Sequence, residues 1–435
     1  NSGWDNSSNA NVPDKEIEFK DGPIQFEFNK VDYSASMTES EAVANYIANT
    51  RIASTDPGTV TLCFDIGGST TDILALTKMK VDNSSNDQVA MVKQSSIRFA
   101  ASNIAQATKF SPNFQSVIKA LLDKKGVKVE GLNKGANKYS TSTAPYFFEQ
   151  IVDRLEPHEF EEFYRKLGVD CKEMVSVNLY ITGLIVYYAG QLAKKVKLEI
   201  DKSPNRSNQW DMQPTKFEIL FTGKGSRIMD WLRAINPSES GNYYMNMFMK
   251  GFGGMEEAKK YLGGPPLFMD REKHSEDVKY EVAKGLAASP VNNIFVQNSE
   301  INPLELIGEE GFMLIKDDGN HISLNSDSSI TPEMMKAIGG KFVHMPKNSE
   351  IPCPRFMEFA QSYFVIATKH FGLKCTKEDF FEGFKRMNIS DYIRLTPEYK
   401  MGLINEKTDK FDFVAPIIIL EGMQFFENVI LKKIK

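Results

Sequence analysis

Residues 59–80 read TVTLCFDIGGSTTDILALTKMK, and this stretch decides how the rest of the chain is interpreted. A β-branched and apolar run ends at the pair Gly67-Gly68, and a second apolar run, Ile73–Leu76, follows after four polar residues. Neither run shows the 3.6-residue periodicity of an amphipathic helix. The stretch therefore predicts a strand, a tight glycine turn and a second strand.

The turn between these two strands has the composition of an anion site. Adjacent glycines allow positive φ and let a ligand approach the backbone with no Cβ in the way. Successive N–H groups in such a turn form a concave anion site, and Ser69, Thr70 and Thr71 add hydroxyl donors. Asp65, beside the turn, suits a hydrated Mg²⁺, which takes few protein ligands. The alternative is a plain β-hairpin in which Asp65 and Asp72 are ordinary turn residues.

Composition narrows the class of protein. The chain has 435 residues, 41% hydrophobic and 25% charged, with a net charge of −5, so two or three domains fit within it. It has no basic run or basic–aromatic stripe, which argues against a nucleic-acid partner. Its four cysteines are scattered without a CxxC pair, which favours a reducing, cytoplasmic compartment and no zinc site. No apolar segment reaches the roughly 18–20 residues of a membrane span.

A second glycine-rich stretch, FEILFTGKGSRIMDWLRAI, occupies residues 217–235. It predicts a buried strand, a turn and a helix, an arrangement that presents free N–H groups to phosphate or ribose oxygens. The P-loop pattern is absent because Gly225 follows Lys224, and the dinucleotide fingerprint is absent because Ile228 replaces its third glycine. The alternative here is a tight turn without a ligand.

The remaining segments supply helices and further strands. Residues 37–52 and 274–288 predict helices, and residues 89–99 predict a strand that completes an antiparallel meander, unlike a parallel dinucleotide-binding sheet. Residues 242–261, with glycine clusters inside and just after them, predict a loop-rich insertion. Short strands and helices follow residue 289.

Four of these segments resemble, in the same order, the second lobe of the actin-like ATPase superfamily of actins, seventy-kilodalton heat-shock chaperones and sugar kinases. Residues 65–72 resemble its second phosphate motif, and residues 221–227 resemble its adenosine motif. Residues 39–44 resemble the chaperones' helix leading into this lobe. Residues 279–287 resemble the second connecting helix, whose small residues let two domains hinge. The motif style is closest to bacterial chaperone-like ATPases.

The resemblance implies an α/β, ribonuclease-H-like fold, a mixed sheet flanked by helices, that binds ATP or ADP with Mg²⁺. It implies contacts to the β- and γ-phosphates from the first turn and to the α-phosphate and ribose from the second. Asp65 would orient Mg²⁺-bound or attacking water, and Arg227 would lie against the adenine face. The expected cofactor-binding residues are Gly67, Gly68, Ser69, Thr70, Thr71, Gly223, Lys224, Gly225, Ser226 and Arg227.

Two departures from the family shape the expected organisation. Ser69 stands where the chaperones have a third glycine, and no first phosphate motif is found. We therefore expect residues 1–36 to be a lead-in from a preceding lobe, residues 37–290 the second lobe with an insertion near 111–170, and residues 291–435 an α+β extension of unknown role. On this view the missing lobe lies upstream of Asn1, and ATP hydrolysis requires it. Alternatively, residues 65–72 are themselves the first phosphate motif.

The expected function is nucleotide binding and hydrolysis coupled to domain closure, with a protein partner at the insertion or the C-terminal region. A catalytically silent scaffold or regulatory protein with the same fold is the first alternative. A kinase acting on a small hydroxyl compound is the second, although the sequence offers no recognisable aspartate as its general base.

Overall fold

The computed structural model describes residues 17–19, 22–24, 39–50, 56–80, 87–108, 110–124, 155–204, 206–207, 210, 214–268, 280–287, 295–296, 306–315, 318–329, 341–344, 353–371, 373–385 and 416–434. The chain divides into two units, Asn1–Thr38 and Glu39–Lys435, each described by itself. In the first unit, β1 (Ile17–Phe19) and β2 (Gly22–Ile24) pair as a short antiparallel hairpin. All other elements belong to the second unit.

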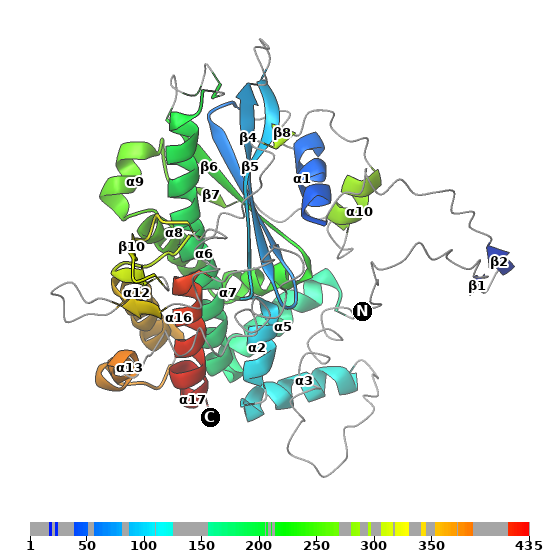
Figure 1. The fold of residues 1–435 in the computed structure, drawn as a ribbon. Helices are drawn as coiled ribbons and strands as arrows, with labels where there is room; N and C mark the ends of the chain where they lie inside the picture. The colour runs from blue at the N-terminus through cyan, green and yellow to red at the C-terminus, as the bar shows by residue number, and fades with distance from the viewer. Residues whose placement is uncertain are drawn as a thin grey trace. The chain divides into compact units, whose positions relative to one another are not determined.

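A mixed sheet of six strands forms the centre of the second unit (Figure 1). The strands follow the order β7-β6-β3-β4-β5-β8. The first three along the chain form the predicted antiparallel meander, whereas β6 pairs parallel with the other side of β3 and β7 parallel with β6. The predicted strand, turn and strand are confirmed, as is the α/β class. The strands are β3 (Thr59–Ile66), β4 (Thr71–Lys80), β5 (Asp87–Ile97), β6 (Lys216–Thr222), β7 (Leu267–Phe268) and β8 (Phe295–Val296).

One face of the sheet packs against a single long helix, α6 (Lys172–Lys202). Phe64 and Ile73 of the sheet share a buried cluster with Tyr188 of α6, whose hydroxyl lies 3.3 Å from Ser95 Oγ. Among the described helices, α6 alone is long and apolar enough to cross a membrane, and its apolar window is entirely buried inside the protein. The apolar side chains of α6 are thus explained by its packing in the protein core.

The opposite face of the sheet packs against two short helices, α1 (Glu39–Thr50) and α10 (Tyr280–Ala287) (Figure 1). These helices lie very close together, since a Cβ on Gly285 would be 1.7 Å from the Ala42 carbonyl oxygen. Asn45 Nδ2 also donates to the Gly285 carbonyl at 2.7 Å. The two segments that resemble family helices therefore form one pair, although they are more than 230 residues apart in the sequence.

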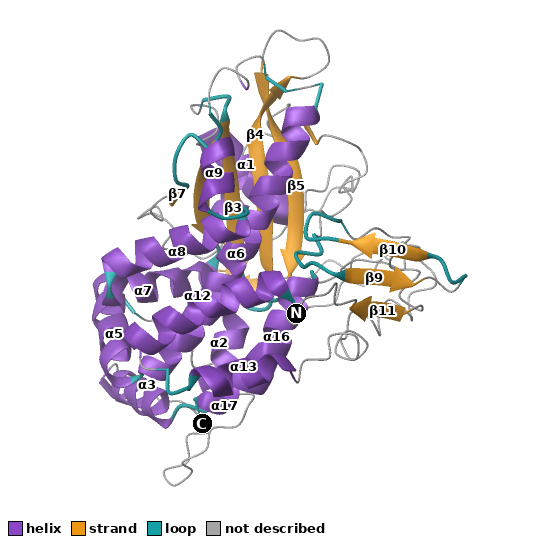
Figure 2. Cartoon of the chain, turned by 90° about the vertical axis from the view of Figure 1, so that its left-hand side faces the viewer, coloured by secondary structure: helices purple, strands orange, loops and turns teal. Residues whose placement is uncertain are grey.

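Further helices enlarge the core on the α6 side (Figure 2). The expected loop-rich insertion at residues 242–261 is wrong: α8 and α9 cover it, and the flanking glycines only mark the helix ends. Residues 125–154 of the expected insertion near 111–170 lie outside the described residues. The helices are α2 (Ala101–Thr108), α3 (Pro112–Lys124), α5 (Pro157–Asp170), α7 (Met229–Ile235), α8 (Pro237–Gly251) and α9 (Met255–Tyr261).

The C-terminal region contributes to the same core. Side chains of α12 and α16 join the cluster around α6, and the Tyr180 hydroxyl donates to the Gly422 carbonyl at 2.7 Å. A separate antiparallel sheet has the order β10-β9-β11 (Figure 2). The elements are β9 (Phe312–Ile315), β10 (His321–Leu324), β11 (Lys341–His344), α12 (Pro354–Phe371), α13 (Lys377–Lys385), α16 (Ile417–Phe425), a π-helical turn (Phe426–Ile430) and α17 (Leu431–Lys433).

Candidate functional site

The two glycine-rich turns meet at the carboxyl ends of neighbouring parallel strands. β3 and β6 pair in parallel up to Asp65 and Thr222, so the turns that follow them lie side by side. A Cβ on Gly225 would be 2.5 Å from the carbonyl oxygens of both Ile66 and Gly67. The carboxyl ends of adjacent strands, where the chain leaves in two directions, are where α/β sheets bind ligands. The structure thus joins two motifs that are about 150 residues apart in the sequence.

Gly223 fixes the geometry of the second turn. It has φ +75°, and a Cβ there would be 2.1 Å from Asp65 Oδ1. Any other residue would be strained by its backbone conformation and would push the Asp65 carboxylate aside. The Asp65 carboxylate therefore lies against the backbone of Gly223, where there is no side chain.

Helix α2 fixes the direction in which the peptide groups of the hairpin turn point. The carbonyls of Gly67 and Gly68 accept from the N–H groups of Ala101 and Ser102 at 3.4 and 2.7 Å. Because a trans peptide points its N–H opposite to its C=O, the N–H groups of Gly68 and Ser69 both point away from α2. Within the described residues, neither N–H has an acceptor. Two adjacent donors that point the same way at an exposed turn have the arrangement from which an anion can accept hydrogen bonds.

The reason for these two glycines differs from the prediction. Neither Gly67 nor Gly68 has positive φ, so the turn does not use the conformation that adjacent glycines allow. The turn is instead closed by a 2.8 Å hydrogen bond from the Gly67 N–H to the Thr70 carbonyl. A Cβ on Gly67 would be 3.2 Å from that carbonyl oxygen, whereas one on Gly68 would meet nothing within 4 Å. A side chain at Gly67 would crowd the Thr70 carbonyl, and a side chain at Gly68 would extend into open space. These features, and not unusual dihedral angles, distinguish the two glycines.

The predicted hydroxyl ligands divide into two groups. Ser69 is exposed and Thr70 half-buried at the turn. The Thr71 hydroxyl is buried and donates to the Phe99 carbonyl at 2.8 Å. The Ser226 hydroxyl is likewise buried and donates to the Gly223 carbonyl at 2.7 Å. The last two hydroxyls hold the turns in shape and have their protons engaged within the protein.

The rest of the second turn is a short 3-10 helix, η4 (Lys224–Ile228), where the sequence predicts a direct entry into an α-helix. Lys224 begins η4, and the half-buried Arg227 lies one residue before its end. α7 follows immediately, which places the whole predicted motif between β6 and α7.

A row of polar side chains crosses the sheet beside the turns. The strand registers align Thr222, Asp65, Asp72 and Ser96 on four adjacent strands. Because side chains alternate along a strand, this row continues the face that α1 and α10 cover. Among the described residues, no group of three or more His, Cys, Asp or Glu side chains could hold a metal ion. Two opposed carboxylates remain, which is sufficient for a hydrated Mg²⁺ that keeps most of its waters.

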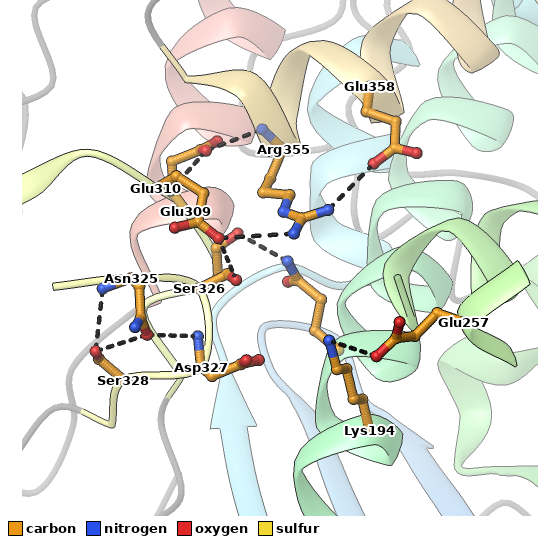
Figure 3. Close-up of polar contacts among 12 residues, drawn as sticks. Lys194, Glu257, Glu309, Glu310, Asn325, Ser326, Asp327, Ser328, Arg355 and Glu358 are labelled. Carbon is orange, nitrogen blue, oxygen red and sulfur yellow. Dashed lines mark hydrogen bonds and ion pairs between the residues drawn. The ribbon is translucent and has the colours of Figure 1, made fainter. Parts of the chain in front are cut away.

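A second polar cluster lies in the core near the C-terminal helices, and the sequence did not indicate it. The carboxylate of Glu309 accepts from the backbone N–H groups of Glu310, Arg355 and Phe356 at 2.7–2.9 Å, and so caps the start of α12. Around it, the Arg355 guanidinium lies 3.6 Å from Glu310 and 3.8 Å from Glu358 (Figure 3). The available signal was a lone carboxylate, Glu421, within the apolar run IIILEGMQF.

Burial changes the protonation of this cluster. It raises the pKa of the Glu309 carboxyl to about 7, although the backbone donors act in the opposite direction. Burial also raises the pKa of Glu421 well above its usual value, and repulsion from Glu309 adds to the effect. Among the described residues, neither Glu421 oxygen has a partner at hydrogen-bond geometry, although Glu309 and the Cys353 thiol are near enough to affect its pKa. Burial and the neighbouring Glu309 carboxyl therefore both favour the protonated form of Glu421.

Comparison with known protein families finds no match for this chain, and comparison with curated proteins finds none either.

Proposed function

We propose that this chain is a nucleotide-binding lobe of the actin-like ATPase type, which binds Mg²⁺–ATP or Mg²⁺–ADP at the carboxyl ends of β3 and β6. The observation that carries the proposal is the pair of parallel N–H groups of Gly68 and Ser69, next to the turn at Gly223–Arg227. Support for the fold comes from the mixed sheet flanked by helices, in which the antiparallel meander β3-β4-β5 is extended on the β3 side by parallel strands.

The donor set fits the charge of such a ligand. The Gly68 and Ser69 N–H groups suit phosphate oxygens, and the exposed Ser69 hydroxyl lies at the same turn. Asp65, over the bare backbone of Gly223, would hold Mg²⁺ through its water ligands. The half-buried Arg227 would face the adenine ring.

Hydrolysis of ATP requires more groups at the site than binding does. Phosphoryl transfer to water relies on groups that position the water and neutralise charge on several phosphate oxygens. Among the described residues, the site offers the carboxylates of Asp65 and Asp72, which lie opposite each other on neighbouring strands of one sheet. We therefore propose ATPase activity only where a second lobe completes the site, and domain closure would then accompany it.

Calorimetry with Mg²⁺–ATP tests the binding proposal with a matched pair of variants. Gly68→Ala adds a methyl group that contacts no protein atom within 4 Å but narrows the approach to the unused N–H groups. Gly264→Ala makes the same change, also in open space, beyond the opposite end of β6. We expect Gly68→Ala to weaken binding at least tenfold and Gly264→Ala to leave it unchanged. Absence of binding by the unaltered protein, or equal binding by all three, overturns the proposal.

A further inference from the structure

Two buried side chains hold the second turn from behind. The Tyr164 hydroxyl of α5 donates to the Arg227 carbonyl at 3.2 Å, and Asn178 Nδ2 of α6 donates to the Ile228 carbonyl at 2.8 Å. These are consecutive carbonyls at the end of η4, and the two donors come from different helices. Tyr164 and Asn178 are 3% and 1% exposed, so the donor side chains of both hydrogen bonds are shielded from water.

We infer that Tyr164 and Asn178 are positioning residues for the adenosine end of the nucleotide site. The inference rests on the proposed function. It assigns a role to α5, which belongs to the expected insertion near 111–170: this helix sets where the Gly223–Arg227 turn lies relative to the glycine hairpin.

The helix that carries Tyr164 is itself fixed against the element that follows the turn. The Tyr164 ring packs on Trp231 of α7 with centroids 5.6 Å apart, and Trp231 also packs on Phe114 of α3 at 6.4 Å. A Cβ on Gly168 would be 2.7 Å from Ile235 Cγ1, so α5 and α7 approach closely. A shift of α5 would therefore move α7 and η4 with it.

Asn178 shows the cost of this arrangement. Its Oδ1 is buried with no hydrogen-bond partner among the described residues. A buried and unsatisfied acceptor is costly to stability, and a leucine of similar size would avoid that cost. The amide gains only the bond to Ile228, which favours a role in holding η4 over a role in general packing.

The turn is thus held on two sides. On one side, Gly225 lies against the carbonyls of Ile66 and Gly67, and on the other the two side chains hold Arg227 and Ile228. Loss of the second hold would let η4 shift while the hairpin, bound to α2, stays in place. The adenosine part of a ligand would then lose contacts, but its phosphate chain would not.

The test compares Mg²⁺–ATP with Mg²⁺–tripolyphosphate on the full chain. Tyr164→Phe removes only the hydroxyl and keeps the ring on Trp231. The matched control is Tyr180→Phe, which loses a buried hydroxyl bond of the same kind to Gly422 of α16. We expect Tyr164→Phe to weaken ATP binding about fivefold, the factor that corresponds to one hydrogen bond of roughly 1 kcal/mol. Tripolyphosphate binding should be unchanged, and Tyr180→Phe should change neither.

A ligand-free measurement separates this inference from the proposed function. Amide hydrogen exchange across residues 224–228 should accelerate in Tyr164→Phe and in Asn178→Leu, but not in Tyr180→Phe. Unchanged exchange, or equal weakening for ATP and tripolyphosphate, overturns the positioning role. If the unaltered protein binds ATP but not more weakly after Tyr164→Phe, the inference fails while the proposed function stands. If the unaltered protein binds neither ligand, the proposed function fails first and the positioning role with it.

Discussion

Glu421 places a carboxyl group among the apolar side chains of α16, next to a second buried carboxyl, Glu309. Both groups have pKa values raised above the ordinary 4.5 of a glutamate, so the folded protein binds protons that the unfolded chain releases. The free energy of unfolding must then fall as pH rises above about 4.5, and go on falling until the folded-state pKa values are passed. The contribution of the pair is complete only below that range.

Glu421→Gln should remove most of this pH dependence. The amide has nearly the same shape and carries no charge, so the variant should gain on the unaltered protein as pH rises from 5 to 8. The gain at pH 8 should be on the order of 1–3 kcal/mol, since one unit of raised pKa corresponds to about 1.4 kcal/mol. Urea unfolding at pH 5, 6, 7 and 8 measures it.

Glu256→Gln is the control for that series, because its side chain is 90% exposed. It should change the unfolding free energy little at any of the four pH values. A difference between Glu421→Gln and the unaltered protein that stays constant from pH 5 to 8 would show that Glu421 is already ionised in the folded state.

At the scale of single elements, local sequence patterns predicted which residues form strands, but not which elements pack or pair with one another. The two apolar runs in residues 59–80 and the glycine pair between them were sufficient to predict β3 and β4, because a hairpin is a short-range structure. The pairing of β3 with β6 joins segments about 150 residues apart and leaves no local signal. The direction of the Gly68 and Ser69 N–H groups depends on α2, which the turn sequence does not contain. The glycines at 251–254 suggested loops, although they only separate α8 from α9.

Replacing glycine by alanine should have opposite effects on stability at two helix positions, one where α10 packs on α1 and one in α8. Gly285→Ala should destabilise the protein by about 1–3 kcal/mol, because its Cβ would overlap the Ala42 backbone and force the helices apart. Gly241→Ala, in α8, meets nothing within 4 Å and should stabilise it by roughly 0.5–1 kcal/mol through backbone entropy. Thermal denaturation of the two variants measures both. Unchanged or increased stability in Gly285→Ala would contradict the close packing of α1 on α10, and a loss in Gly241→Ala would contradict the open space around that residue.

At the scale of the whole molecule, the sheet and the C-terminal helices share one core. Residues of α12 and α16 belong to the cluster that surrounds α6 and reaches Phe64 and Ile73 of the sheet. The sequence predicted an α+β extension of unknown role over residues 291–435, because local composition does not show which faces pack together. The described residues of α12 and α16 therefore contribute to the stability of the sheet that carries the site.

Truncation after residue 415 should destabilise that sheet. The deletion removes α16, whose side chains at Ile417, Ile418 and Ile419 are at most 1% exposed, and uncovers part of α6. Burying each such side chain contributes roughly 1.5–3 kcal/mol, so the loss should amount to several kcal/mol. Hydrogen exchange of β3, β4 and β5 should accelerate in the truncated chain. Unchanged protection of these strands would mean that the C-terminal helices form an independent domain.

The two outermost strands of the central sheet, β7 and β8, each contain only two residues. β8 pairs only with Ala90 and Met91 of the 11-residue β5, and β7 pairs only with Glu218 and Ile219 of the seven-residue β6. Among the described residues, most of the outer side of β5 and of β6 therefore has no pairing strand. The unpaired backbone groups of such an edge are where a strand from another molecule can add, so the described part of this sheet is compatible with growth by edge-to-edge addition.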